Sequence, residues 1–171
     1  MQRVGHMLAT GLAIGAAAAA QPQVDLAKLD WAAFLGRHDM LWQRLPDRFE
    51  NAAFTGNGQL GAMVMATEQG QVLKWQMGRS DVAFSTFRIP IGDLLLRPAG
   101  KILSADMRLD LWQAELRGTL RTDKGSIEFR TFTHSQQMVN VWETVTTGAE
   151  KVSWSWPVSY THLTLPTKRK V

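Results

Sequence analysis

Short apolar or alternating runs, separated by turn residues, recur from Gly61 to Trp156 and constrain the fold more than any other feature. In KVSWSW, residues 151–156, valine and tryptophan occupy every second position. Comparable runs lie at 61–66, 71–77, 92–98, 114–122, 126–134 and 138–145. Alternation turns one face of a strand into a core and the other into water, as in antiparallel sheets. The pattern predicts an all-β fold, an antiparallel β-sandwich or barrel.

The residues that precede these runs show a different spacing of apolar side chains. Leu26, Leu29, Ala33 and Phe34 recur at helical intervals, and Pro46 prevents a helix from continuing beyond it. We therefore expect a short helical N-terminal segment before the strands, within one domain at residues 21–157.

Residues 1–20 have the features of a signal peptide. A basic start at Arg3 precedes an apolar, alanine-rich stretch at 7–20, which is too short to span a bilayer comfortably. The alternative is a buried alanine-rich helix. The signal-peptide interpretation predicts a secreted or periplasmic protein with no membrane span after cleavage.

The tail at 158–171 does not resemble a domain segment. Its first ten residues, VSYTHLTLPT, resemble the conceptual translation of a transposase-type sequencing adapter. We expect the natural sequence to depart near Pro157, so that the domain at 21–157 is incomplete. The alternative is a genuine threonine-rich strand with a basic tail. On the adapter interpretation, KRKV is not a nuclear or nucleic-acid signal.

Charge and composition argue against several classes of function. Outside the two ends, fifteen basic residues balance fifteen acidic ones, so nothing favours nucleic acid as a partner. The chain has no cysteine, which excludes disulfides and thiol chemistry. His38 and His134 are isolated, so we expect no metal site, and no cofactor is predicted.

The segment FTGNGQLGAMVMA contains Gly56, Gly58 and Gly61 in the order G-x-G-x-x-G. In a dinucleotide-binding fold this motif needs a buried strand before it and a helix after it. The polar LPDRFENAAF precedes the motif, and Gly70 would soon end a helix that began after it. We therefore favour a structural turn, in which Gly56 and Gly58 supply positive φ angles around Asn57.

The same segment resembles the start of glycoside hydrolase family 95, whose members include α-L-fucosidases and α-L-galactosidases. IPIGDLLLRP and MRLDLWQAELRGTLRTDKGSIEFRTFTHSQQMVNVW are similar to later segments of that family, in the same order. Where the family has an Asn-Glu-Asp-x-x-Trp type of segment, this chain has GRSDV. A related, uncharacterised glycosidase N-terminal domain is therefore the alternative match.

This resemblance implies a truncated, supersandwich-like β-sandwich that precedes an α/α barrel. In the family the catalytic groups belong to the barrel and hydrolysis inverts the anomeric centre, with acid and base about 6.5–9.5 Å apart. The implied parent enzyme acts on α-linked deoxyhexose or related sugars. We predict no catalytic residue in this chain, which alone should be inactive, and expect the missing barrel and a carbohydrate as partners.

Candidate substrate-binding residues lie on the segments expected to be loops. They are Asn57 in the glycine turn and Arg79, next to Ser80, and Asp81 in GRSD. The alternative is that Arg79 and Asp81 pair with each other or with the missing barrel. Asp110, between two leucines, is expected to hydrogen-bond a neighbouring turn.

Seven tryptophans are many for this length. Trp154 and Trp156 share one strand face, with Trp142 nearby in sequence, and could form a platform on which sugar rings stack. They could equally belong to the core or to a domain interface. The platform interpretation leads to a second hypothesis, a stand-alone carbohydrate-binding or structural sandwich without hydrolase activity.

Overall fold

A computed structural model describes residues 25–84 and 87–157 of the chain. The predicted signal peptide at 1–20 and the predicted adapter-derived tail at 158–171 lie outside these ranges. Within the described residues, no helix is long and apolar enough to cross a membrane.

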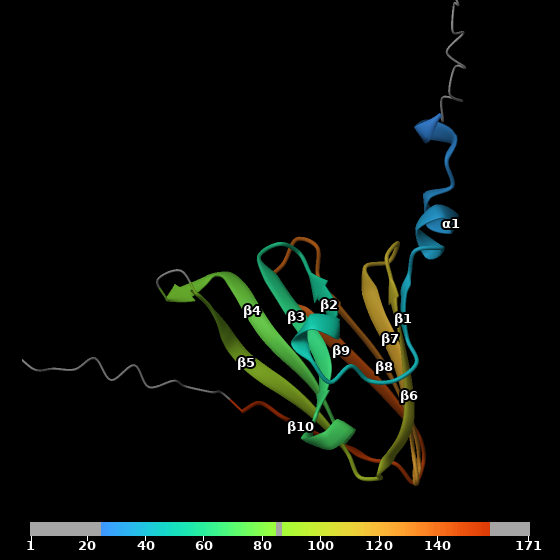
Figure 1. The fold of residues 1–171 in the computed structure, drawn as a ribbon, viewed down its shortest axis with the longest axis vertical. Coiled ribbons are helices and arrows are strands. Elements are labelled where there is room, and N and C mark those ends of the chain that lie inside the picture. The colour runs from blue at the N-terminus through green and yellow to red at the C-terminus, as the bar shows by residue number, and fades with distance from the viewer. Residues whose placement is uncertain (1–24, 85–86, 158–171) are drawn as a thin grey trace, which may run out of the picture.

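The described residues form two five-stranded antiparallel sheets, which confirms the predicted all-β sandwich (Figure 1). The first sheet has the order β1-β6-β7-β8-β9, and these strands are Met40–Trp42, Ile102–Asp110, Glu115–Thr122, Gly125–Thr133 and Asn140–Gly148. The second has the order β10-β5-β4-β3-β2, and these are Val152–Ser155, Phe87–Pro98, Val72–Phe84, Leu60–Thr67 and Ala53–Gly56.

The predicted helical N-terminal segment is also present. It consists of a 3-10 turn, η1 (Leu26–Lys28), and a short helix, α1 (Trp31–Gly36). The Asp30 carboxylate caps α1 by accepting from the Ala33 backbone N–H at 3.0 Å. Figure 1 shows α1 beyond the ends of the strands. Two further 3-10 turns, η2 (Phe49–Asn51) and η3 (Glu68–Gly70), lie between strands.

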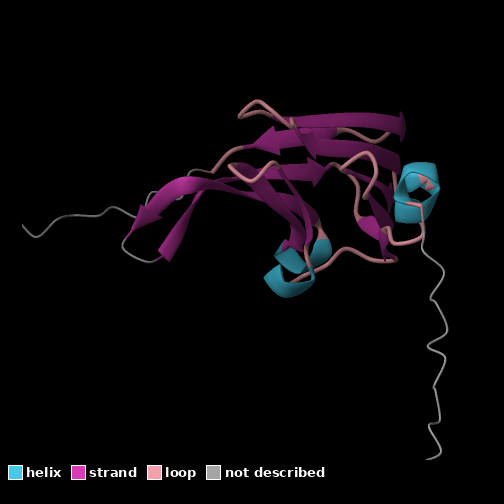
Figure 2. Cartoon of the chain, turned by 90° about the horizontal axis from the view of Figure 1, so that it is seen from above, coloured by secondary structure: helices cyan, strands magenta, loops and turns pink. Residues whose placement is uncertain are grey.

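The core lies between the inner faces of the sheets, where every second side chain points. Trp75 of β4 is fully buried and meets Phe129 of β8 edge to face, with ring centroids 6.0 Å apart. Strand β2 packs on β7 and β8, whereas β4 and β5 extend away from that contact (Figures 1 and 2). The sandwich is therefore tightest at β2 and opens towards β5 and β10.

Trp154 of β10 and Trp156, which follows that strand, pack against the second sheet. The Trp154 ring lies 5.6 Å from that of Trp75, and the Trp156 ring lies over Gly92, where an added Cβ would be 2.7 Å away. Trp142 packs against the core from β9. Trp154 and Trp156 remain 39% and 42% exposed. These contacts favour packing at the core margin over a flat, solvated platform for sugars.

A buried glutamate links three turns at one end of the sandwich. Glu150, in the β9–β10 turn, accepts hydrogen bonds from the backbone N–H groups of Ala99 at 2.8 Å and Gly100 at 3.1 Å. It also accepts from the Lys151 N–H at 2.9 Å and from the Thr122 hydroxyl. Because these donors come from three chain segments, Glu150 joins the β5–β6, β7–β8 and β9–β10 turns.

Candidate functional site

Three glycines lie side by side across the second sheet. Gly56 of β2 is the register partner of Gly61 of β3, which in turn is opposite Gly78 of β4. Residues paired in an antiparallel sheet project to the same face. The nearest residues of the same strands on this face are Phe54 and Met63, which are exposed and half-buried, so the glycines lie on the outer face of the sheet. On the outer face, these three glycines therefore form a strip where only backbone atoms reach the surface, which we call the glycine strip.

The turn prediction for these glycines is correct in part. Gly58 has a φ of 88°, as expected for the hairpin between β2 and β3. The predicted positive φ at Gly56 is wrong, because Gly56 belongs to strand β2. An added Cβ would lie 3.3 Å from the Leu60 carbonyl oxygen at Gly56, and 3.0 Å from the Thr55 carbonyl oxygen at Gly61. Close approach of two backbones explains these glycines.

The dinucleotide alternative lacks its structural context. Gly61 lies within strand β3 (Leu60–Thr67), so the motif leads into a strand and not into the helix N-terminus that would receive a pyrophosphate.

A groove of about 610 Å³ lies over the glycine strip. The rings of Phe49 and Phe54 border it and are 56% and 51% exposed. Next to the strip, the Ser80 N–H donates to the Gln59 carbonyl oxygen at 2.8 Å, and both residues line the groove. The polar residues that line the groove are Gln59, Gln76, Arg79, Ser80 and Arg88, together with Thr55, whose buried hydroxyl bonds Thr133 inside the sandwich. It therefore combines apolar ring faces with amides, hydroxyls and guanidinium groups.

Asn57 does not line this groove, although Gly56 and Gly58 on either side of it do, and its side chain is used inside the protein. Its Oδ1 accepts from the Gln59 and Leu60 N–H groups at 3.0 and 2.8 Å. Its Nδ2 donates to the carbonyl oxygens of His134 and Gln137 at 2.9 and 3.1 Å. Both amide hydrogens and the oxygen are thus engaged. Asn57 positions the glycine hairpin against the β8–β9 loop.

Arg79 and Asp81 lie in strand β4 (Val72–Phe84), so the loop predicted at GRSD is wrong. The pairing of β4 with β5 shifts at Gly78, which lets the strand carry polar residues there. The Arg79 Nε and Nη2 donate to the two Asp81 carboxylate oxygens at 3.0 and 2.7 Å. Arg79 and Ser80 line the groove, whereas Asp81 does not. The two charged candidates therefore pair with each other at its rim.

Arg88 is a groove residue that sequence reasoning missed. It lies in β5, opposite Ala83, and its side chain is exposed. Within residues 25–84 and 87–157, no hydrogen bond or ion pair reaches its guanidinium. Phe49, Phe54, Gln59 and Gln76 were also missed. Alternation could have placed Phe54 beside Gly56, but only the strand register brings Arg88 to the same groove.

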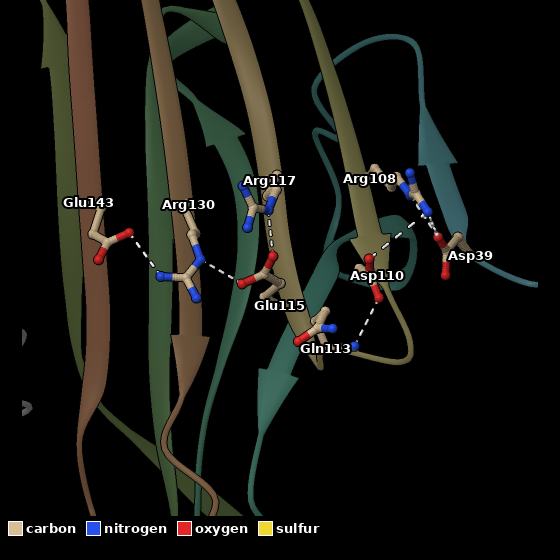
Figure 3. A network of polar contacts seen from close by, with 8 residues as sticks. All are labelled: Asp39, Arg108, Asp110, Gln113, Glu115, Arg117, Arg130 and Glu143. Carbon is tan, nitrogen blue, oxygen red and sulfur yellow. Dashed lines mark hydrogen bonds and ion pairs between the residues drawn. The ribbon is translucent and has the colours of Figure 1, made fainter. Parts of the chain in front are cut away.

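The outer face of the first sheet carries a separate charged network (Figure 3). Arg108, Arg117 and Arg130 are neighbours in register across β6, β7 and β8. The buried Glu115 carboxylate accepts from both Arg117 and Arg130. Burial alone would raise the pKa of Glu115, but these two arginines outweigh burial and lower it. Glu115 thus stays charged and offsets the repulsion between the arginines.

The same face includes Asp110, whose carboxylate accepts from the Gln113 N–H at 2.8 Å. This confirms the expected hydrogen bond to a neighbouring turn. Asp39 joins the network by accepting from Arg108 and from the Leu111 N–H, as Figure 3 shows for the arginine. The backbone hydrogen bond from Leu111 is the main reason that the pKa of Asp39 lies below its usual value. These carboxylates have structural partners.

The groove offers amide, hydroxyl and guanidinium groups beside its aromatic rings. Its lining, taken over the described residues, contains no carboxylate. Residues 25–84 and 87–157 also contain no group of three or more histidine or acidic side chains arranged to hold a metal ion.

A scan against protein-family models and a search of curated proteins both give no match for this chain. The resemblance to glycoside hydrolase family 95 stays a prediction.

Proposed function

We propose that this chain is the N-terminal scaffold of an exported glycoside hydrolase of the family 95 type, and that its groove binds part of the sugar chain. The parent enzyme would act on α-linked deoxyhexose or related sugars, with acid and base supplied by a separate α/α barrel. This chain would be catalytically inactive alone. The sandwich fold is compatible with this role, and the groove carries the proposal.

The groove suits a saccharide for three physical reasons. The exposed faces of Phe49 and Phe54 can pack on the C–H faces of pyranose rings. Gln59, Gln76 and Ser80 supply donors and acceptors for sugar hydroxyls. The floor belongs to three hydrogen-bonded strands, so the ligand meets a rigid surface.

A stand-alone carbohydrate-binding module is the second candidate. It is favoured by one observation: every described residue of the groove comes from this one domain, between Phe49 and Pro90. Binding would then need no barrel. The continuation of the gene distinguishes the candidates, since the hydrolase requires a long helical-hairpin region after the sandwich and the module does not.

Calorimetric titration of the chain with a panel of oligosaccharides, including fucosylated ones, tests binding at the groove. We expect Phe54→Ala to weaken binding by about tenfold, because a stacked ring contributes on the order of 1 kcal/mol or more. Trp112→Ala is the matched control, since Trp112 is also 51% exposed but lies in the β6–β7 turn. Equal effects of the two substitutions, or no binding of any saccharide, would refute the proposed groove. Glycoside hydrolysis by the chain alone would refute the scaffold role.

A further inference from the structure

The charged side chains of the groove are of one sign. Its described lining includes Arg79 and Arg88 but no aspartate or glutamate. Arg79 is neutralised by its two-point contact with Asp81 at the rim. Arg88 has no such partner among the described residues. The groove therefore offers one uncompensated guanidinium beside its apolar rings and amides.

Arg88 is well placed relative to the glycine strip. Pro90 is the register partner of Gly78, so it continues the strip onto β5. Arg88 lies two residues from Pro90 in the same strand, and alternation puts both on one face. Both line the groove, so a ligand lying along Gly56, Gly61 and Gly78 would end at Arg88.

We propose that the groove selects a saccharide that carries a carboxylate or sulfate group, and that Arg88 is the residue that recognises this group. The inference rests on the proposed sugar-binding role of the groove. A guanidinium presents a planar fork of N–H donors that matches two oxygens of either anion. Such a charge-assisted contact favours an anionic over a neutral sugar, because only the anion adds it to the other contacts of the groove.

Substitution of Asp81 should change the affinity for an anionic saccharide in the opposite direction to substitution of Arg88. Its carboxylate neutralises Arg79 and would repel an anionic ligand at the rim. Asp81→Asn should therefore strengthen binding of an anionic saccharide several-fold. If Asp81 instead binds sugar hydroxyls directly, the same substitution would weaken binding.

The experiment titrates the chain with three oligosaccharides of equal length: a neutral one, one containing uronic acid, and one carrying sulfate. We expect one or both anionic ligands to bind at least about tenfold more tightly than the neutral one, and comparison of the two identifies which anion is preferred. Arg88→Gln should remove this preference, so that the anionic ligands bind no more tightly than the neutral one. Arg121→Gln is the matched control, because it removes one exposed arginine charge from the other sheet.

Arg88→Lys keeps the positive charge but removes the planar pair of N–H donors. If the two-point contact matters, this variant should show only part of the preference for anionic ligands. Equal binding of neutral and anionic ligands, or an anion preference that survives in Arg88→Gln, would overturn the inference and leave sugar binding intact. Absence of binding to all three would instead overturn the proposed groove itself. Binding of inorganic sulfate with the same affinity as the sulfated saccharide would also overturn the inference, since the sugar would then contribute nothing.

Discussion

Glu150 is a buried side chain whose charge state should control the stability of the sandwich. Burial works to raise its pKa, but hydrogen bonds from the Thr122 hydroxyl and three backbone amides outweigh burial and lower it. A carboxyl group whose pKa is lowered by folding stabilises the fold above its unfolded pKa. This contribution is lost as the pH falls through the lower, folded pKa.

We expect Glu150→Gln to lower the free energy of unfolding near neutral pH by about 1–3 kcal/mol, because three backbone donors lose a charged acceptor. The difference from the unsubstituted protein should shrink in acid, where Glu150 itself becomes protonated. Urea unfolding followed by tryptophan fluorescence, at about pH 7 and about pH 3, measures this. Glu128→Gln, exposed on β8, is the control and should change stability little. A Glu150→Gln loss that is equal at both pH values would contradict the expectation.

At the level of elements, the glycine hairpin between β2 and β3 is held by the Asn57 side chain. Asn57→Ala removes two hydrogen bonds within the hairpin and two to the β8–β9 loop. We expect a loss of about 1–3 kcal/mol in unfolding free energy. Amide hydrogen exchange at Gln59 and Leu60 should become faster, because their N–H groups lose an acceptor.

A direct role of Asn57 in sugar binding makes a different prediction. Asn57→Ala would then weaken saccharide binding without changing the thermal unfolding midpoint or the exchange rates. Gln137→Ala serves as the control, because Asn57 bonds only the backbone carbonyl of Gln137 and that contact survives.

The strands that sequence alternation predicts best are those with one clearly apolar face. Strands β7 and β8 follow the runs predicted at 114–122 and 126–134, and they are joined by a turn at Asp123 and Lys124. Strand β6 has the same signal, since Ala105, Met107 and Leu109 are buried in alternation. Its intervening serine and charged residues lower its mean hydropathy, and for that reason the strand does not stand out in the sequence.

The groove is harder to predict because it depends on register. Alternation does not determine which residue lies opposite which, and β4 shifts its pairing with β5 between Met77 and Ala83. The polar segment GRSD resembles a loop in the sequence, but in the structure it continues strand β4. Position in the sequence is enough to suggest Arg79 as a site residue, whereas Arg88 requires the pairing of β4 with β5.

At the scale of the whole molecule, the sandwich has edge strands with exposed apolar side chains. Strand β9 pairs only with β8 among the described strands, and its Val145 is 62% exposed. An unpaired strand edge with apolar side chains is a template for association with another chain. We therefore expect the chain to self-associate on heating.

Val145→Lys should reduce this association, because a charge on an edge strand disfavours pairing. Glu128 lies directly opposite on β8 and can receive the new cation, so stability should change by less than about 0.5 kcal/mol. Light scattering during a thermal ramp provides the measurement. Val145→Ile is the control and should associate as the unsubstituted protein does. Indistinguishable scattering from the two variants would show that β9 is not the associating edge.

The backbone floor of the groove has one consequence for how this surface can change. Gly56, Gly61 and Gly78 have no side chain to shorten, so substitution there can only add atoms and narrow the space. Gly78 is the position that tolerates such an addition, because nothing lies within 4 Å of a Cβ built on it. Substitutions of the floor glycines could therefore make the groove smaller but never larger. A groove that accepts a larger ligand would need changes in the side chains around its floor.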